Sequence, residues 1–312
     1  MLRRSLNSLE TSSISDWMEA VDDLLEAGRI ARSVRSDIPS MVRAGMPVLE
    51  LAERIESMIL DYGGRPAFPC NISIDSVAAH YTPPPGDLSL LPRGSVVKID
   101  VGVAVNGYIA DTAITVSDTH LGESLRYAAE EALKAAIRGV KAGVRVSTIG
   151  NTIQSVVTRL GFKPIRNLTG HEITRYNLHA GVSIPNVATY DGVRLEAGHV
   201  YAIEPFVTLA DAAGEVYDAG EPTIFKLEKA GMGRMSEQER EVAAVLDKRF
   251  DGLPYTLRWL RDVDDKFIAV HSRLVRMGRI RGYPILAERS GKPVAQAEHT
   301  IIVKEDGCEV IT

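Results

Sequence analysis

Four acidic residues stand at matched positions in two repeated parts of the 312-residue chain. The segments LPRGSVVKID and LEAGHVYAIE share the pattern Leu-x-x-Gly-x-Val-x-x-Ile followed by an acid, and they end at Asp100 and Glu204. A second pattern, Ala-acid-x-x-Ile-x-Val, matches Asp111 with Glu298. Self-similarity of this kind indicates an internal duplication, in which each half contributes two carboxyl groups.

The chemistry of these acids depends on whether they meet. A single acid at the end of an apolar run is more often a solvated loop residue, because Asp and Glu are mostly exposed. Coincidence does not readily repeat an acid at both matched positions inside segments as apolar as VVKIDVGV and VYAIEPFV. Two halves related by approximate symmetry would bring the four carboxyl groups together, where like charges need cations among them. The repeat therefore predicts a site for divalent metal ions.

An imidazole commonly completes a carboxylate metal site. Among the seven histidines, His171 is the candidate ligand, since it follows a glycine in the second half and has His179 eight residues later. The first half offers His80, in the segment Ala-His-Tyr-Thr-Pro. The tetrapeptide that starts at His171 does not form a zincin helix motif, because the second histidine four residues on is missing. From the residues alone, a structural role is favoured for both, with His80 packed beside Tyr81 and His179 held by its backbone at a strand end.

The elements that must position these residues recur as well. The segments RAGMPVLELAERIESMILDYGGRP and KAGVRVSTIGNTIQSVVTRLGFKP carry apolar residues at the same helical spacing, and a glycine closes each stripe. Asn106-Gly107 separates two apolar runs, which is the strongest short-range signal for a hairpin because both residues tolerate positive φ. Each half is thus predicted to supply a helix, a strand ending in an acid and a second strand that carries an acid.

Composition and charge limit the classes of partner that we expect for this chain. The chain has 36 basic and 41 acidic side chains, a net charge of -5 and a pI near 5.9, so we expect no membrane and no specific nucleic acid as partner. Cys70 and Cys308 are too few for a disulfide framework and too far apart for a CxxC site. The sequence lacks both an apolar export signal near its start and a run of about 18 apolar residues that could span a bilayer. We expect a cytoplasmic protein.

Over nearly its whole length the chain resembles the type 2 methionine aminopeptidases, in an archaeal-like form, within the pita-bread metallopeptidases. The segments that carry the resemblance are Phe68-Pro69, Ala79-His80-Tyr81-Thr82-Pro83, Lys98-Ile99-Asp100-Val101-Gly102, Ala110-Asp111, Gly170-His171, His179-Ala180-Gly181, Ala202-Ile203-Glu204 and Gln296-Ala297-Glu298-His299-Thr300. The resemblance implies an α+β pita-bread fold, with duplicated helix and antiparallel-strand halves around a central sheet, in one catalytic domain over 1–312. A helical insertion subdomain is implied at about 229–285, where SEQEREVAAVLDKRF and DDKFIAVHSRLVRMGR have helical patterns.

The resemblance also implies roles for individual residues. The implied metal ligands are Asp100, Asp111, His171, Glu204 and Glu298. His80 and His179 are expected to bind the substrate and to act on the scissile amide and its oxyanion. Glu204 is expected to carry a proton as well, and Phe68 and Leu178 are expected to line the pocket for the methionine side chain.

The implied activity is the removal of the initiator methionine from nascent proteins when the second residue is small. Two divalent ions, bridged by Asp111 and Glu298, would serve as cofactors, and Co, Mn, Fe and Zn all accept this ligand set. The substrates would be peptides and nascent chains with an N-terminal methionine. The enzyme would act on them as a monomer in proximity to the ribosome.

Two other readings stay open. An X-Pro aminopeptidase or prolidase would use the same five ligands, but such enzymes usually carry an additional N-terminal domain, whereas 99 residues precede Asp100 here. A non-catalytic pita-bread protein that binds RNA or ribosomes would typically have lost ligand residues, and this chain keeps all five. The acidic pI also argues against RNA binding.

Overall fold

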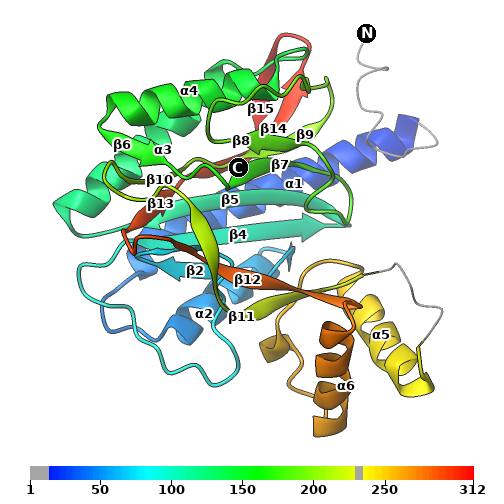
Figure 1. The fold of residues 1–312 in the computed structure, drawn as a ribbon. Helices are drawn as coiled ribbons and strands as arrows, with labels where there is room; N and C mark the ends of the chain where they lie inside the picture. Colours follow the sequence, from blue (N-terminus) through cyan, green and yellow to red (C-terminus); the bar gives the residue numbers. More distant parts are fainter. Residues whose placement is uncertain (1–13, 229–234) are drawn as a thin grey trace.

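A central antiparallel sheet organises the computed structural model, which describes residues 14–228 and 235–312 (Figure 1). Its strands are β1 (Arg65–Pro66), β2 (Asn71–Ile74), β4 (Val97–Val105), β5 (Tyr108–Val116), β7 (Thr169–Ile173), β8 (Ser183–Pro185), β9 (Val200–Ile203), β14 (Glu298–Lys304) and β15 (Gly307–Val310). The main path runs β1-β4-β5-β14-β9-β7-β8, while β2 also pairs with β4 and β15 with β14. Strands of the first half therefore meet strands of the second half where β5 pairs with β14.

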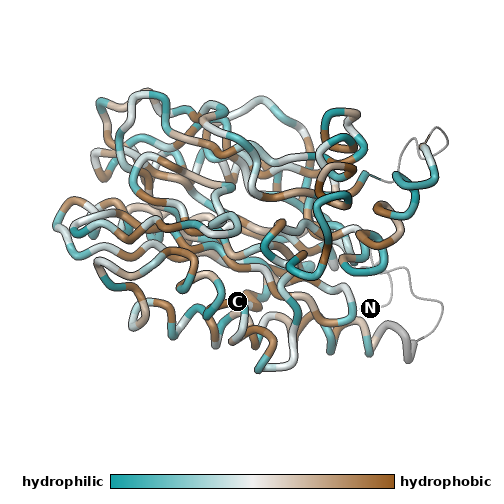
Figure 2. The backbone as a smooth tube through the Cα atoms, turned by 90° about the horizontal axis from the view of Figure 1, so that it is seen from below, coloured by the Kyte–Doolittle hydropathy of each residue, from teal (hydrophilic) through white to brown (hydrophobic). Residues whose placement is uncertain are grey.

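Helices of the two halves pack against this sheet in equivalent ways. They are α1 (Ile14–Met41), α2 (Val48–Asp61), α3 (His120–Arg138) and α4 (Val146–Arg159). The stripes predicted for α2 and α4 are buried, with Ile55 and Ile153 fully inaccessible. Apolar and polar segments alternate along the chain trace, as expected for elements that bury one face (Figure 2). One core forms around α1 and α2 and another around α3 and α4, which agrees with the predicted duplication.

The predicted hairpin between β4 and β5 is confirmed. Asn106 and Gly107 have φ of 49° and 87°, and they connect Val105 to its partner Tyr108. Positive φ at both central residues is typical of the tight turn that matches the right-handed twist of the strands. The long pairing of β4 with β5 continues beyond Asp100, which therefore lies inside its strand and does not end it as predicted.

Two smaller sheets and a helical segment complete the described part of the chain. One sheet contains β6 (Phe162–Pro164), β10 (Phe206–Leu209) and β13 (Val294–Gln296), and the other contains β3 (Val77–Ala79), β11 (Val216–Leu227) and β12 (Ile280–Glu288). Between β11 and β12 lie α5 (Glu237–Phe250), the short helix η3 (Leu257–Trp259) and α6 (Asp265–Arg276), where two helices were predicted. Ser236 and Glu239 form a capping box that starts α5. Residues 229–234 of the predicted insertion lie outside the described residues.

A buried ion pair ties η3 to α2. Both terminal nitrogens of the Arg258 guanidinium donate to the carboxylate of Glu56, and Trp259 Nε1 donates to the same carboxylate at 2.8 Å. Arg258 and Glu56 are only 3% and 6% exposed. A charge held this far from water depends on its partner, because removal of one member leaves the other buried and unpaired.

Replacing Arg258 with methionine is therefore expected to lower the free energy of unfolding by about 3 to 5 kcal/mol, the usual cost of breaking a buried pair. Denaturant unfolding followed by fluorescence would measure the loss. Arg261→Met is the matched control, because Arg261 pairs with Glu53 at the surface, where such pairs contribute about 0 to 1 kcal/mol. Equal losses in the two variants would contradict the argument.

Candidate metal centre

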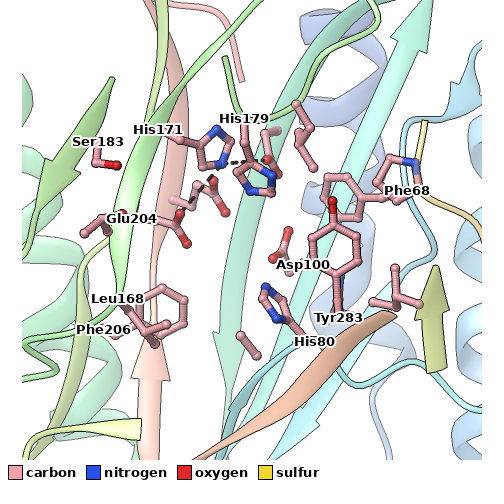
Figure 3. Close-up of a pocket in the computed structure, with 18 of the residues that line it drawn as sticks. Phe68, His80, Asp100, Leu168, His171, His179, Ser183, Glu204, Phe206 and Tyr283 are labelled. Atoms are coloured by element: carbon pink, nitrogen blue, oxygen red, sulfur yellow. Dashed lines mark ion pairs between the residues drawn. The ribbon is translucent and has the colours of Figure 1, made fainter. Parts of the chain in front are cut away.

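A cavity of about 340 Å³ lies beside the central sheet (Figure 3). All nine residues predicted for the site line it. They are Phe68, His80, Asp100, Asp111, His171, Leu178, His179, Glu204 and Glu298. Both halves of the duplication contribute to this lining. The tertiary structure thus brings together residues that the sequence predicted from separate repeats.

The order of the strands explains how the four acids meet. The strands β4, β5, β14 and β9 are consecutive neighbours in the sheet. Asp100 is on β4 and Asp111 on β5, and the register aligns Asp111 with a residue two positions from Asp100, so both side chains project from the same face. Glu298 begins β14, and Glu204 directly follows β9. The two halves therefore present their carboxyl groups in the symmetrical arrangement that the repeat predicted.

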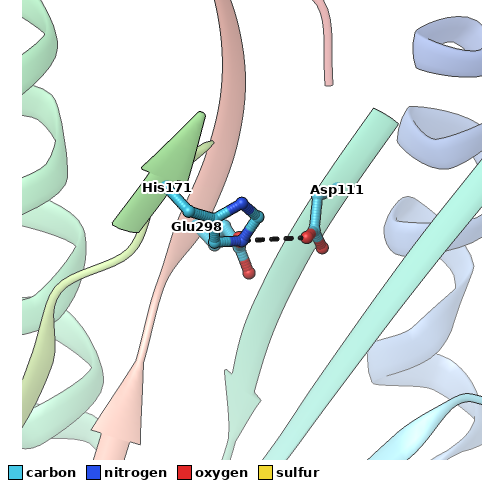
Figure 4. A group of neighbouring side chains, drawn as sticks. All are labelled: Asp111, His171 and Glu298. Carbon is cyan, nitrogen blue, oxygen red and sulfur yellow. Dashed lines mark ion pairs between the residues drawn. The ribbon is translucent and has the colours of Figure 1, made fainter. Parts of the chain in front are cut away.

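The distances between side chains suit a shared cation. Asp111, His171 and Glu298 each offer a ligand atom, and these atoms all lie within 4.8 Å of one another (Figure 4). His171 Nε2 is 3.6 Å from Asp111 Oδ2 and 3.7 Å from Glu204 Oε1. These separations are too long for hydrogen bonds. Ligands that bind one ion at about 2.0 to 2.2 Å lie at comparable separations from each other.

Several carboxylate oxygens in the cavity have no donor. Among the described residues, nothing donates a hydrogen bond to Asp100 Oδ1, Asp111 Oδ1 or Glu298 Oε1, although all three atoms are buried. Gln296 Nε2 donates to one oxygen of Glu204 and to the other oxygen of Glu298, each at 3.3 Å. Buried polar atoms are normally satisfied, since an unmade hydrogen bond costs about 1 to 3 kcal/mol. Divalent cations would coordinate these oxygens, so the side chains present fit the predicted metal.

Burial also shifts the protonation of the site. It raises the pKa of Asp111 to about 7. The pKa values of Asp100, Glu204 and Glu298 lie well above their ordinary range, first because of burial and then because of the neighbouring acids. Burial lowers the pKa of His171 to about 4, so its imidazole is neutral near pH 7 and can offer a lone pair. In the absence of metal, the carboxyl groups hold protons that a cation would displace.

Two further histidines face the same cavity. The ring centroids of His171 and His179 are 4.4 Å apart, and those of His80 and Tyr283 are 5.6 Å apart. Burial lowers the pKa of His80 to about 4, and the surrounding protein together with the neighbouring His171 and His80 lowers the pKa of His179, so both imidazoles are neutral. His80 has φ of 65°, a left-handed conformation that costs a bulky residue about 1 to 3 kcal/mol and is found mainly at functional sites.

The apolar part of the lining comes from Phe68 and Leu178, which are 5% and 6% exposed. The Phe68 ring lies against Gly102 of β4, where any Cβ atom would collide with it. Glycine at this position is therefore required for Phe68 to reach the cavity. The result is a cavity with an acidic part, which fits metal ions, and an apolar part, which fits an apolar side chain.

Tyr283 in the lining and Gln296 beside it are among the residues of the site that were not predicted. Tyr283 enters from β12, on the far side of the helical segment, and no motif in the sequence marks it. Gln296 stands two residues before Glu298 in one of the segments used for the family resemblance, but no role was assigned to it. The sequence signal for Gln296 was its position two residues before the predicted ligand Glu298.

Comparison with known proteins identifies the family. Residues 22–305 match the metallopeptidase family M24. The chain belongs to this family. The methionine aminopeptidase of Pyrococcus horikoshii is 45% identical to this M24 metallopeptidase over 295 residues, which cover 94% of the chain and 99% of the relative. The crystal structure of the methionine aminopeptidase from Thermotoga maritima has a TM-score of 0.68 at 21% identity, and the match covers 97% of this chain and 98% of that one.

A prolidase shares the fold but not the length. The structure of the prolidase from Pyrococcus furiosus gives a TM-score of 0.58 at 17% identity, and the match covers 94% of this chain but 64% of the prolidase. The predicted α+β pita-bread fold is confirmed for this M24 metallopeptidase. As a metallopeptidase it is a hydrolase that uses divalent metal, as predicted. None of its described helices is long and apolar enough to cross a membrane.

Proposed function

We propose that this M24 metallopeptidase removes the N-terminal methionine of peptides and nascent proteins when the second residue is small. The observation that supports this most directly is the 45% identity to a methionine aminopeptidase over almost the full length of both chains. The gathering of all nine predicted residues around one cavity agrees with it. A cavity with one acidic and one apolar part is compatible with a free α-amino group next to a methionine side chain.

The metal ligands of this proposal are Asp100, Asp111, His171, Glu204 and Glu298. When bound, two divalent ions supply Lewis acidity for the scissile carbonyl and a nucleophile at neutral pH. Asp111 and Glu298, on the paired strands β5 and β14 where the halves join, would each help to hold both ions, as the family resemblance implies. The hard oxygens and single imidazole are compatible with Mn, Fe, Co and Zn.

The remaining groups act on the substrate. A neutral imidazole has one N–H donor, so His80 and His179 can each donate a hydrogen bond to the scissile amide or to its developing oxyanion. A well-placed donor of this kind contributes about 2.7 to 4 kcal/mol to transition-state stabilisation. Glu204 is assigned to carry a proton to the leaving amine. Phe68 and Leu178 would bury the methionine side chain at the apolar part of the cavity.

The decisive assay compares two peptide classes in metal-reconstituted samples whose metal content is measured in parallel. We expect turnover of Met-Ala-Ser and Met-Gly-Ser, much slower turnover of Met-Leu-Ser, and little hydrolysis of a dipeptide that ends in proline. The metal-free sample is the control. Faster hydrolysis of the proline dipeptide would favour a prolidase. Metal binding without any peptidase activity would favour the non-catalytic alternative.

The cellular setting is part of the same proposal. Nascent chains are made in the cytoplasm, so we infer a cytoplasmic enzyme that works in proximity to the ribosome, as a monomer. We also propose that 1–312 form one catalytic domain with a helical subdomain at about 229–285. The separate cluster of buried side chains around α5 and α6 supports this subdomain.

A further inference from the structure

The loop that follows β7 carries two of the residues assigned to the substrate, Leu178 and His179. Backbone hydrogen bonds hold the base of this loop, because Ala180 N donates to Glu172 O at 2.8 Å. Near its start, Thr174 and Asn177 exchange two backbone hydrogen bonds of 3.0 Å each, which makes Arg175 and Tyr176 the tip. The segment that presents Leu178 to the cavity therefore runs directly from this tip.

The tip contacts the turn between β4 and β5. Tyr176 N donates to Gly107 O at 2.8 Å, and Arg175 Nε donates to Asn106 O at 2.9 Å. The Arg175 guanidinium also lies over two aromatic rings, 5.0 Å from the centroid of Tyr108 and 5.5 Å from that of Tyr176. Two hydrogen bonds and the cation–π contact with Tyr108 thus join a loop of the second half to a hairpin of the first half, while the contact with Tyr176 lies within the loop.

The fit at this contact is close. A Cβ atom on Gly107 would collide with the Tyr176 ring, so only glycine leaves room for it. Tyr176 has φ of 57°, a conformation that an aromatic residue keeps only where its surroundings hold it. The turn is itself fixed, since Asn106 Nδ2 donates to both carboxylate oxygens of Asp23 on α1, at 3.0 and 3.1 Å. The tip therefore packs against a turn that hydrogen bonds to α1 hold in place.

We propose that Arg175 and Tyr176 are positioning residues, which set the place of Leu178 and His179 relative to the metal ligands. The hairpin that they contact carries Asp100 and Asp111 on its strands, whereas the loop carries the side chains assigned to the methionine pocket. Docking the loop on the turn of that hairpin fixes the separation between these two parts of the site. The choice of substrate rests on the proposed function, but the docking itself does not.

The first test is Arg175→Met, which removes the hydrogen bond to Asn106 and the cation–π contacts while it keeps an apolar stem. We expect a rise of about tenfold in KM for Met-Ala-Ser. We also expect a fall of about tenfold in the ratio of kcat/KM for Met-Ala-Ser to that for Leu-Ala-Ser, because Leu178 is displaced. A general loss of folded protein would lower the apparent kcat/KM for both substrates equally and leave this ratio unchanged. Arg159→Met, an exposed arginine on α4, is the matched control.

A second variant approaches the contact from the hairpin side. Gly107→Ala introduces a Cβ against the Tyr176 ring without changing the loop, and we expect the same fall in the substrate ratio. Should this variant fail to fold, Arg175→Met decides the question alone. Metal content must equal that of the wild type, since the ligands themselves are unchanged.

Amide hydrogen exchange supplies a readout that does not depend on any substrate. In the metal-loaded full chain, we expect Arg175→Met to speed exchange at Asn177 and Ala180, whose amides form the hydrogen bonds of the loop. An unchanged substrate ratio together with unchanged exchange would overturn the proposal. If the wild type cleaves no methionine peptide, the proposed function fails, whereas the exchange experiment still decides whether the tip holds the loop.

Discussion

Removal of the metal is expected to abolish peptidase activity and to destabilise the protein more at pH 7 than at pH 5. The reason is the cluster of buried carboxyl groups. The pKa of Asp111 is about 7 in the folded, metal-free protein, against an ordinary value of 3.8. Between about pH 4 and pH 7 the unfolded chain ionises this group while the fold keeps it protonated. The fold therefore loses stability as pH rises through this window. Bound cations remove this loss, because they stabilise the ionised carboxylates.

The measurement is the thermal unfolding of chelated and metal-loaded samples across pH 5 to 7.5. The difference in Tm should widen as pH rises, and adding Mn or Co to the chelated sample should restore both Tm and activity. Calorimetric titration in buffers of different ionisation enthalpy should show that protons leave as metal binds. A Tm difference that stays constant or narrows with rising pH would contradict the account.

Glu298→Ala is expected to lower kcat/KM for Met-Ala-Ser by about 10³-fold or more with metal present, which corresponds to about 4 kcal/mol of transition-state stabilisation. Glu298 is 2% exposed and stands on the strand that joins the two halves, where we assign it to bridge the ions. Its loss should reduce the stoichiometry of bound metal. The fold should persist, because the substitution removes a buried acid whose ionised form burial and the neighbouring acids destabilise in the metal-free protein.

Two measurements separate a lost bridge from a lost fold. Circular dichroism and the Tm of the chelated variant should match or exceed those of the chelated wild type, while metal analysis should show fewer ions bound. Glu305→Ala, an exposed acid in the turn after β14, is the control and should keep full activity. Activity like that of the wild type in the Glu298 variant would refute the bridging role.

Features with a local cause were predictable from the sequence. The Asn106-Gly107 turn depends on two residues that tolerate positive φ, and the buried stripes of α2 and α4 depend on a helical period of apolar residues. The duplication added long-range information, because matched acids in two copies had to be related by the same symmetry. The strand end predicted at Asp100 was wrong because the apolar run continues to Val105, and pairing with β5 keeps all of it in the strand.

The sequence by itself determined the acids and histidines of the site, the duplication and the family resemblance, since these depend on residue types and their spacing. The tertiary structure alone decided which other residues join them. Tyr283 reaches the cavity from β12, and Arg175 and Tyr176 meet the β4–β5 turn. No local period or turn preference encodes such contacts, because they arise where separate elements pack, and packing depends on the shape of the whole fold.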